Sequence, residues 1–118
     1  MLLNLSNHPS SAWPAEQLRA AVEQYGSVQD MLFPNVPPEA DIDAVRRLAE
    51  EYSLRIQTLD PKPTAVHLMG EMTFTYQLVS LLQAVGMLCI ASTTLREVTE
   101  EGEKKISRFR FVRFRPYF

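Results

Sequence analysis

The chain has 118 residues, 46% of them hydrophobic, and its 12 basic and 14 acidic side chains give a formal net charge of −2. This size suits one globular domain, residues 1–118, with a modest core. The charge gives no sign of the basic excess that usually accompanies binding of duplex nucleic acid. Because there is no run of about 18 apolar residues and no basic, apolar leader, we expect a soluble, non-exported protein with no membrane partner.

Cys89 is the single cysteine. It lies inside the apolar run MLCIA, which predicts a buried and inert thiol, no disulfide, and a reducing, cytoplasmic compartment. His8 and His67 are the two histidines, so we expect neither a metal cage nor a resident cofactor. His67 belongs to an apolar strand pattern and is interpreted as a hydrogen-bonded core residue.

Residues 2–5 are mostly apolar and predict a first strand, which ends before Pro9 because proline cannot donate to the ladder. Pro14 suits a first helical turn, and the apolar spacing after it predicts a helix that ends at Gly26. The apolar stripe of that helix comprises Leu18, Ala21, Val22 and Tyr25. Residues 28–33 predict the second strand, and a turn-rich segment follows.

Asp41 is expected to cap a second helix, because aspartate accepts hydrogen bonds from the free N–H groups of a first turn. The apolar positions of this helix are Ile42, Val45, Ala49, Tyr52 and Ile56. Its solvated side carries Arg46, Arg47, Glu50 and Glu51.

The central stretch, residues 65–75, joins a short apolar run to a helical pattern at Gly70. Residues 65–69 are too few for a helix and follow two prolines, which favours a strand buried on both faces. The helix is expected to end at Gly86 and to bury Met72, Tyr76, Val79, Leu82 and Val85. Such a junction aims free N–H groups above the strand and attracts phosphates, with Thr73 either a ligand donor or simply the helix cap.

Residues 87–91 predict a fourth strand with a polar tail. Residues 95–99 and 106–115 flank a turn around Gly102, which predicts an antiparallel hairpin. The alternation of apolar and charged residues changes parity in the last segment, and a bulge near Val112 would restore it. Arginines and phenylalanines alternate there: Arg108, Arg110, Arg113 and Arg115 with Phe109, Phe111 and Phe114. They form either a nucleic-acid surface or, as we prefer, an amphipathic strand with a solvated or subunit-facing side.

The order of elements predicts a single α/β, Rossmann-like three-layer domain. Its mainly parallel five-stranded sheet has the order 2-1-3-4-5 and ends in a C-terminal antiparallel hairpin strand. In that order the carboxyl ends of strands 1 and 3 open a crevice where ligands bind. Three polar segments reach this edge: Ser6, Asn7, His8 and Ser10; Gly70, Glu71, Thr73 and Thr75; Ser92, Thr93 and Thr94. There His8 can act as acid, base or phosphate donor, and Arg96 can balance charge.

Four segments carry a resemblance that spans almost the whole chain: LLNLSNHPS, FPNV, VHLMGEMTFTYQLV, and ASTTLREV with ISRFRFVRFRPY. The chain resembles small stand-alone CRISPR-associated proteins, relatives of the CRISPR-associated Rossmann-fold sensor domains. Some of these are ring nucleases that open cyclic oligoadenylate second messengers of antiviral defence. The resemblance implies a cyclic oligoadenylate ligand, with cyclic tetra-adenylate as the first choice, bound across a homodimer at the carboxyl edge of the sheet.

The implied reaction needs no metal, because a ribose 2′-hydroxyl attacks the adjacent phosphorus and leaves a 2′,3′-cyclic phosphate. Candidate donors to the phosphate are Ser6, Asn7, Thr73 and Thr75. His8 is the first choice of acid or base and Glu71 the alternative, unless Glu71 only complements the helix dipole. The competing hypotheses are a sensor or sponge that binds without cleaving, a nucleotide-binding regulatory subunit, and a hydrolase of unrelated small phosphoesters.

Overall fold

The sheet is built from strands that lie far apart in the sequence. The computed structural model describes residues 1–118. In chain order the elements are β1 (Leu2–Ser6), the short 3-10 helix η1 (Ser10–Ala12), α1 (Ala15–Tyr25), β2 (Val28–Asp30), α2 (Ile42–Gln57), β3 (Ala65–Met69), α3 (Met72–Ala84), β4 (Leu88–Glu101) and β5 (Lys104–Pro116). The strand order is β2-β1-β3-β4-β5, with β1 to β4 parallel and β5 antiparallel to β4. The predicted α/β fold and strand order are confirmed.

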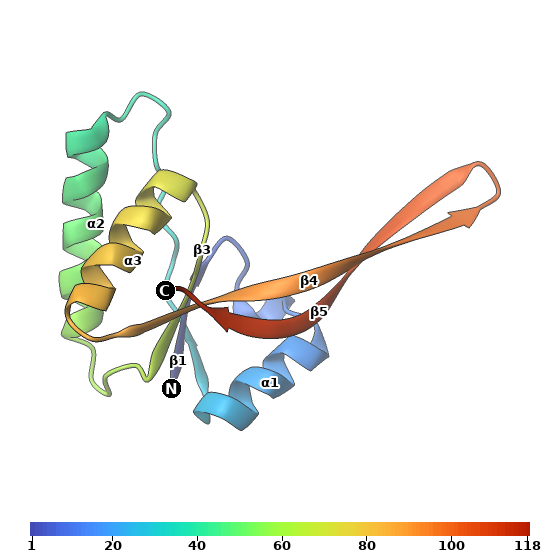
Figure 1. Ribbon diagram of the computed structural model, residues 1–118, viewed down its shortest axis with the longest axis horizontal. Helices are drawn as coiled ribbons and strands as arrows, with labels where there is room; N and C mark the ends of the chain where they lie inside the picture. The colour runs from blue at the N-terminus through green and yellow to red at the C-terminus, as the bar shows by residue number, and fades with distance from the viewer.

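Helices cover both faces of the sheet (Figure 1). α2 and α3 pack against each other on one face, over a core cluster that includes Leu3 and Leu68 of the central strands. On the other face Ala21 of α1 joins a smaller cluster with Phe111 and Phe114 of β5. Because both faces are covered, β1 and β3 bury apolar residues on both sides. The three layers enclose the central strands, as predicted.

Alternate residues of β1 and β3 face the α1 side of the sheet, and some of them are polar. Leu2 and Ala65 belong to the cluster on that side. Asn4 and His67 lie two positions further along their strands and therefore point the same way. These two residues are paired in the register of β1 and β3 and are only 1% and 2% exposed. Two polar side chains, those of Asn4 and His67, thus lie side by side on the face of the sheet that α1 covers.

α1 turns a different face to the sheet from the one that its apolar spacing predicts. Gln17 is buried, whereas the predicted core residues Leu18 and Val22 are exposed. The ring of Trp13, just before the helix, packs edge-on against His67. This contact brings the Gln17 side of the helix inward.

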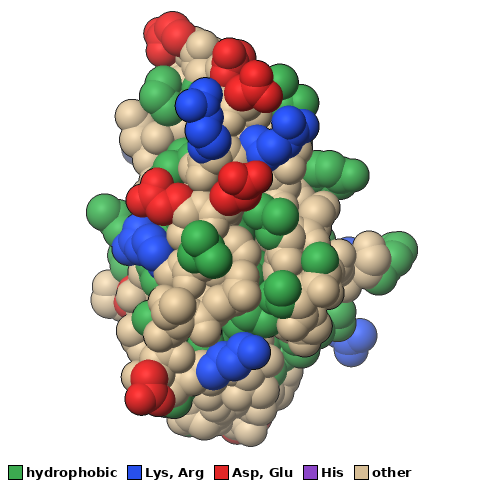
Figure 2. All heavy atoms as spheres, turned by 90° about the vertical axis from the view of Figure 1, so that its left-hand side faces the viewer, with side chains coloured by type: hydrophobic (Ala, Val, Ile, Leu, Met, Phe, Trp, Pro, Cys, Tyr) green, Lys and Arg blue, Asp and Glu red, His purple; other side chains and the backbone are tan.

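α2 follows its prediction closely. Asp41 caps the helix, since its carboxylate accepts the N–H of Ala44 at 2.9 Å. Of the predicted apolar positions, the first-turn residue Ile42 is exposed and the other four are buried. Figure 2 views the side of the molecule that carries α2 and α3, where basic and acidic side chains are interspersed. None of the helices is both long enough and apolar enough to cross a membrane.

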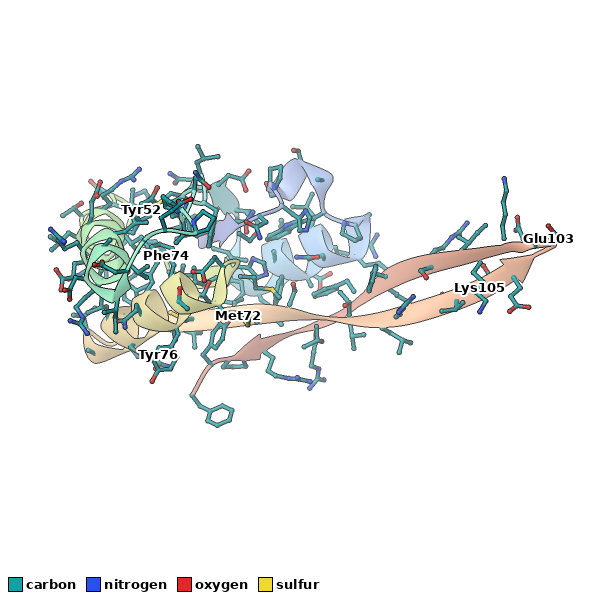
Figure 3. The ribbon with its side chains drawn as sticks, turned by 90° about the horizontal axis from the view of Figure 1, so that it is seen from above. Tyr52, Met72, Phe74, Tyr76, Glu103 and Lys105 are labelled. Carbon is teal, nitrogen blue, oxygen red and sulfur yellow. The ribbon has the colours of Figure 1, made fainter.

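α3 buries only part of its predicted stripe. The prediction is wrong at three exposed positions, namely Met72, Tyr76 and Val85. Phe74 lies in the core instead and packs edge-on against Phe33 and Tyr52, with ring centroids 5.3 and 5.5 Å away. Figure 3 shows Phe74 turned toward Tyr52, with Met72 and Tyr76 on the other side of the helix. The aromatic cluster therefore sets the orientation of α3.

β2 is shorter than predicted and ends at Asp30. The N–H of Met31 still donates to the carbonyl of Asn4 at 2.9 Å. Beyond that bond the chain leaves the edge of the sheet, so that Leu32 is 87% exposed. Phe33 then packs against α3 instead of continuing the strand.

β4 runs without interruption from the parallel sheet into a hairpin with β5. The turn between them contains Gly102 at a φ of 64°, as predicted. The register shifts between Thr93 and Thr94, opposite Val112, so the predicted bulge is confirmed. The far part of this hairpin projects from the body of the domain (Figure 1).

Candidate functional site

A cleft of about 530 Å³ opens at the carboxyl ends of β1 and β3 and beside Ser92 and Thr94 of β4, on the side of the sheet that carries α1. The strand order predicts a ligand site here, because the chain winds outward in opposite directions from β1 and β3. The lining residues come from four segments. They are Ser6, Asn7 and His8 after β1; Ala12, Trp13, Pro14 and Gln17 around the start of α1; His67, Met69 and Gly70 of β3 and its end; and Ser92, Thr94, Phe109 and Phe111 of the hairpin.

A chain of hydrogen bonds crosses the four parallel strands beneath this cleft. The amide nitrogen of Asn4 donates to a carboxylate oxygen of Asp30 at 2.8 Å and to the carbonyl of His8 at 2.9 Å. The amide oxygen of Asn4 lies 2.9 Å from Nδ1 of His67. On the far side of the ring, Nε2 lies 3.2 Å from Oγ of Ser92. The chain therefore passes from β2 through β1 and β3 to β4.

His67 is the buried centre of this chain. Its ring packs edge-on against Trp13 and Phe114, with centroids 5.1 and 5.8 Å away. Burial lowers the pKa of His67 to about 4, because water that would solvate the imidazolium is excluded. The ring is thus neutral at pH 7. It is the hydrogen-bonded core residue that the sequence predicts, and it also lines the cleft.

The loop after β1 is tied to Asp30. The backbone N–H and the hydroxyl of Ser10 donate to the two carboxylate oxygens at 2.9 and 2.7 Å. Burial raises the pKa of Asp30, but the hydrogen bonds from Asn4 and Ser10 outweigh this and hold it below its ordinary value. The indole N–H of Trp13 donates to the carbonyl of His8 at 3.2 Å. Ser10 therefore anchors the loop and does not line the cleft.

Glu71, not Thr73, caps α3. Its carboxylate accepts the N–H of Thr73 at 3.1 Å, the N–H of Phe74 at 2.8 Å and the hydroxyl of Thr73 at 2.7 Å. The bond from the Phe74 N–H, followed by those from Thr73, lowers the pKa of Glu71. This carboxylate occupies the N–H groups that we expected to attract a phosphate. Glu71 lies outside the cleft lining, which favours its helix-dipole role over that of a base.

Four other predicted ligand residues also lie outside the cleft. Thr75 is buried beside a separate hollow of about 570 Å³, and its hydroxyl has no hydrogen-bond partner. Thr73 borders a hollow between α2 and α3. The hydroxyl of Thr93 donates to a carbonyl of β5 at 3.1 Å. Arg96 donates to the hydroxyl of Ser107 at 3.1 Å.

The cleft brings together half of the predicted site residues and adds others that the sequence reasoning missed. The six that meet in it are Ser6, Asn7, His8, Gly70, Ser92 and Thr94. Trp13, Phe109 and Phe111, which were not predicted as site residues, form aromatic walls. Asn4 was missed as well, although a lone amide inside the apolar run LLNL is a signal for a buried polar contact.

The lining contains no Asp, Glu, Lys or Arg. Its polar groups are hydroxyls, amides and imidazoles, which suits a ligand that hydrogen bonds and also stacks on aromatic rings. No three His, Cys, Asp or Glu side chains of the chain lie close enough together to hold a metal ion. Cys89 is buried, and burial raises the pKa of its thiol to about 11, so the thiol stays protonated.

A search of curated proteins and a search of solved structures find no significant match to this chain. A family model, in contrast, matches residues 1–115, which is nearly the whole sequence. The chain therefore belongs to the family described as the uncharacterized protein MJ1673 family.

Proposed function

We propose that this protein is a CRISPR-associated ring nuclease that acts in the cytoplasm. In this proposal it binds a cyclic oligoadenylate in the cleft and opens the ring by metal-independent attack of a ribose 2′-hydroxyl. The observation that carries the proposal is the lining of the cleft, which lies where the chain winds outward in opposite directions from β1 and β3. Aromatic walls stand beside hydroxyl, amide and imidazole groups, and no carboxylate in the lining repels a phosphate.

The aromatic walls supply a surface for adenine. Trp13 lies at one side of the cleft. Phe109 and Phe111 of the hairpin line another side, where Phe109 is exposed and Phe111 is buried against the core. Stacking of a base on such a ring contributes about 1–3 kcal/mol per base. Phe109 is 65% exposed and so is available for stacking without unfolding of the core.

The loop after β1 supplies the groups for a phosphate. Asn7 and His8 are exposed at the cleft, and Ser6 lies at its edge. In this proposal the amide of Asn7 and the imidazole of His8 hold the phosphate in line for attack, and His8 protonates the leaving 5′-oxygen. The hydroxyl of Ser6 donates within the loop, to the amide oxygen of Asn4 at 2.8 Å. Positioning and preorganised donors are enough for appreciable acceleration of this reaction, since the nucleophile is part of the substrate.

The size of the cleft favours a twofold homodimer as the active form. A volume of about 530 Å³ fits a small ligand and holds only part of a cyclic tetranucleotide. A ring with rotational symmetry is matched by two copies of one site, which a twofold dimer provides. We propose that each copy holds half of the ring.

Incubation of the full-length protein with cyclic tetra-adenylate in EDTA, followed by chromatography, tests this function. The expected products are linear adenylates that end in a 2′,3′-cyclic phosphate. Binding without cleavage would identify a sensor or sponge instead. Cleavage of linear adenylates at the same rate would indicate a general phosphodiesterase, and neither binding nor cleavage of any ring size would overturn the proposal.

Two aromatic variants check that the cleft is the binding site. Phe109→Ala is expected to weaken binding of cyclic tetra-adenylate by at least fivefold, on the order of one lost stacking contact of about 1 kcal/mol. Tyr76→Ala removes an aromatic ring of similar exposure from α3, outside the cleft lining, and should leave the affinity unchanged. The same loss in both variants, measured by titration calorimetry, would place the ligand elsewhere.

His8→Ala tests the proposed acid. If His8 carries a proton in the transition state, turnover should fall by roughly 10²–10⁴-fold while affinity stays within a few-fold. Equal losses of affinity and rate would make His8 a phosphate donor only.

A further inference from the structure

We infer that Asp30, Asn4 and His67 fix the ring proton of His67 on Nδ1, and that Ser92 is the group that receives the proton of the substrate hydroxyl. The inference rests on the proposed function, in which that hydroxyl is a ribose 2′-OH. Its basis is a set of hydrogen bonds whose donors and acceptors allow one tautomer of the His67 ring.

Asp30 determines the orientation of the Asn4 amide in this set of hydrogen bonds. Its ionised carboxylate can only accept, and it accepts from both the N–H and the hydroxyl of Ser10. The backbone carbonyl of His8 can only accept as well. The amide nitrogen of Asn4 must therefore face both groups, at 2.8 and 2.9 Å. This leaves the amide oxygen of Asn4 facing His67.

The proton positions on His67 and Ser92 follow from that orientation. An amide oxygen has no proton to give, so Nδ1 of His67 donates to it across 2.9 Å. Nε2 of the neutral ring is then an acceptor, and the hydroxyl of Ser92 donates to it across 3.2 Å. The sulfur of Met69, also 3.2 Å from the hydroxyl, is the weaker acceptor. The lone pairs on the hydroxyl oxygen of Ser92 therefore remain free to accept a hydrogen bond from a ligand in the cleft.

The surroundings of His67 contain no charged group that competes with this arrangement. The ring faces Asn4 of β1, Ser92 of β4, Trp13 before α1 and Phe114 of β5. Asp30, the one titratable group joined to it, reaches it only through Asn4. A phosphate bound beside Ser92 would raise the pKa of the ring, because a nearby negative charge favours the imidazolium. The substrate itself thus makes His67 a better proton acceptor.

In the inferred step the ribose 2′-hydroxyl is the nucleophile and the 5′-oxygen is the leaving group. The 2′-oxygen bonds to phosphorus while its proton passes to Oγ of Ser92, and the proton of Ser92 passes to Nε2 of His67. The bond between phosphorus and the 5′-oxygen breaks, and that oxygen takes a proton from the ring of His8. Ser92 and His8 are the catalytic residues of this step, because both exchange a proton with the substrate. Asp30, Asn4 and His67 act through Ser92 and are positioning residues.

Nitrogen NMR of the imidazole rings in the full-length protein tests the proton arrangement without any ligand. The two rings are assigned by comparison with His8→Ala. We expect His67 to carry its proton on Nδ1 in the wild type and also in Ser92→Ala, because Asn4 sets the tautomer. A wild-type His67 protonated on Nε2 overturns the inference, whatever the ligand does.

Turnover of cyclic tetra-adenylate tests the role of Ser92. Ser92→Ala is expected to cleave roughly 10²–10⁴-fold more slowly with affinity within a few-fold of the wild type. Ser92→Thr keeps the hydroxyl and should recover most of the rate. Ser80→Ala, at an exposed serine of α3 outside the cleft, is the control and should match the wild type.

The outcomes separate this inference from the function on which it rests. Wild-type turnover in Ser92→Ala overturns the inference and leaves the ring nuclease standing. A parallel loss of affinity and rate also overturns it, because Ser92 would then be a phosphate donor. A wild-type protein that binds no cyclic oligoadenylate overturns the proposed function and the step together, while the NMR measurement still decides the proton arrangement.

Discussion

The ring of Phe33 fills the space directly over Gly70, where any other residue would place its Cβ atom. The same ring packs edge-on against Phe74 of α3. The glycine after β3 is therefore explained by this packing, and not by the close approach of a phosphate that the sequence led us to expect.

Gly70→Ala should push the ring of Phe33 away from Phe74. We expect the free energy of unfolding, measured with urea, to fall by about 1–3 kcal/mol, as is usual for overpacking. In a Phe33→Ala background the same substitution should cost much less, because the obstructing ring is gone. Equal costs in the two backgrounds would contradict this explanation.

Glu71→Ala removes the cap of α3. We expect a loss of about 0.5–2 kcal/mol in the free energy of unfolding at neutral pH. Because hydrogen bonds from Phe74 and Thr73 lower the pKa of Glu71, the contribution is present at neutral pH and is lost as the pH falls through that lowered pKa. The stabilities of variant and wild type should converge in acid. Cleavage of cyclic tetra-adenylate should be unchanged, and a large loss of rate without a loss of affinity would restore Glu71 as a base.

The topology could be predicted because each element carries a local signal. Short apolar runs bounded by prolines and glycines mark the strands, and the alternation of strands with helices fixes the parallel order. The buried face of α2 could be predicted from its apolar spacing, but those of α1 and α3 could not. α3 packs on both the sheet and α2, so the aromatic contacts of Phe74 decide its orientation, and spacing within the helix does not reveal them.

The edge of the sheet that carries the cleft could be predicted, but only half of the predicted site residues line the cleft. Ser92 and Thr93 are adjacent and equally polar, yet only Ser92 faces the cleft. Successive residues of a strand point to opposite faces, and the pairing decides which face is which. Asn4 and His67 meet for the same reason, through the register of β1 and β3, which a single sequence does not display.

The buried ring of His67 should make the stability depend on pH. Its pKa is about 4 in the folded protein, against an ordinary 6.5. Between these two pH values the ring is protonated in the unfolded chain but neutral in the folded protein. The contribution is complete above pH 6.5 and is lost as the pH falls toward 4, by up to roughly 3 kcal/mol. Urea titrations across this range should show the free energy of unfolding falling as the pH is lowered. This is expected in the wild type and in His8→Ala, which leaves the buried ring in place. His67→Gln should lack this fall, and an unchanged fall there would assign the effect to other groups.

We expect Arg96 of the hairpin to contact the ligand and Arg110 to lie on the opposite face. Arg96 is paired with Phe109 in the register of β4 and β5, and residues directly opposite each other in a ribbon share a face. Phe109 lines the cleft, so Arg96 lies on the same face of the hairpin as the cleft, although outside its lining. Arg110 is next to Phe109 in the strand, faces the other side and pairs with Glu97 at 3.7 Å.

Arg96→Ala is therefore expected to weaken binding of cyclic tetra-adenylate on the order of two- to fivefold at low salt, the size of an exposed charge contact. The difference from the wild type should shrink as salt is added, because mobile ions screen such contacts. Arg110→Ala makes the same change in net charge on the opposite face, and its affinity should stay at the wild-type value. Fluorescence titrations at two salt concentrations decide the matter. Equal effects of both substitutions would mean that the ligand senses only the net charge of the hairpin, and a larger effect of Arg110→Ala would place the ligand on its other face.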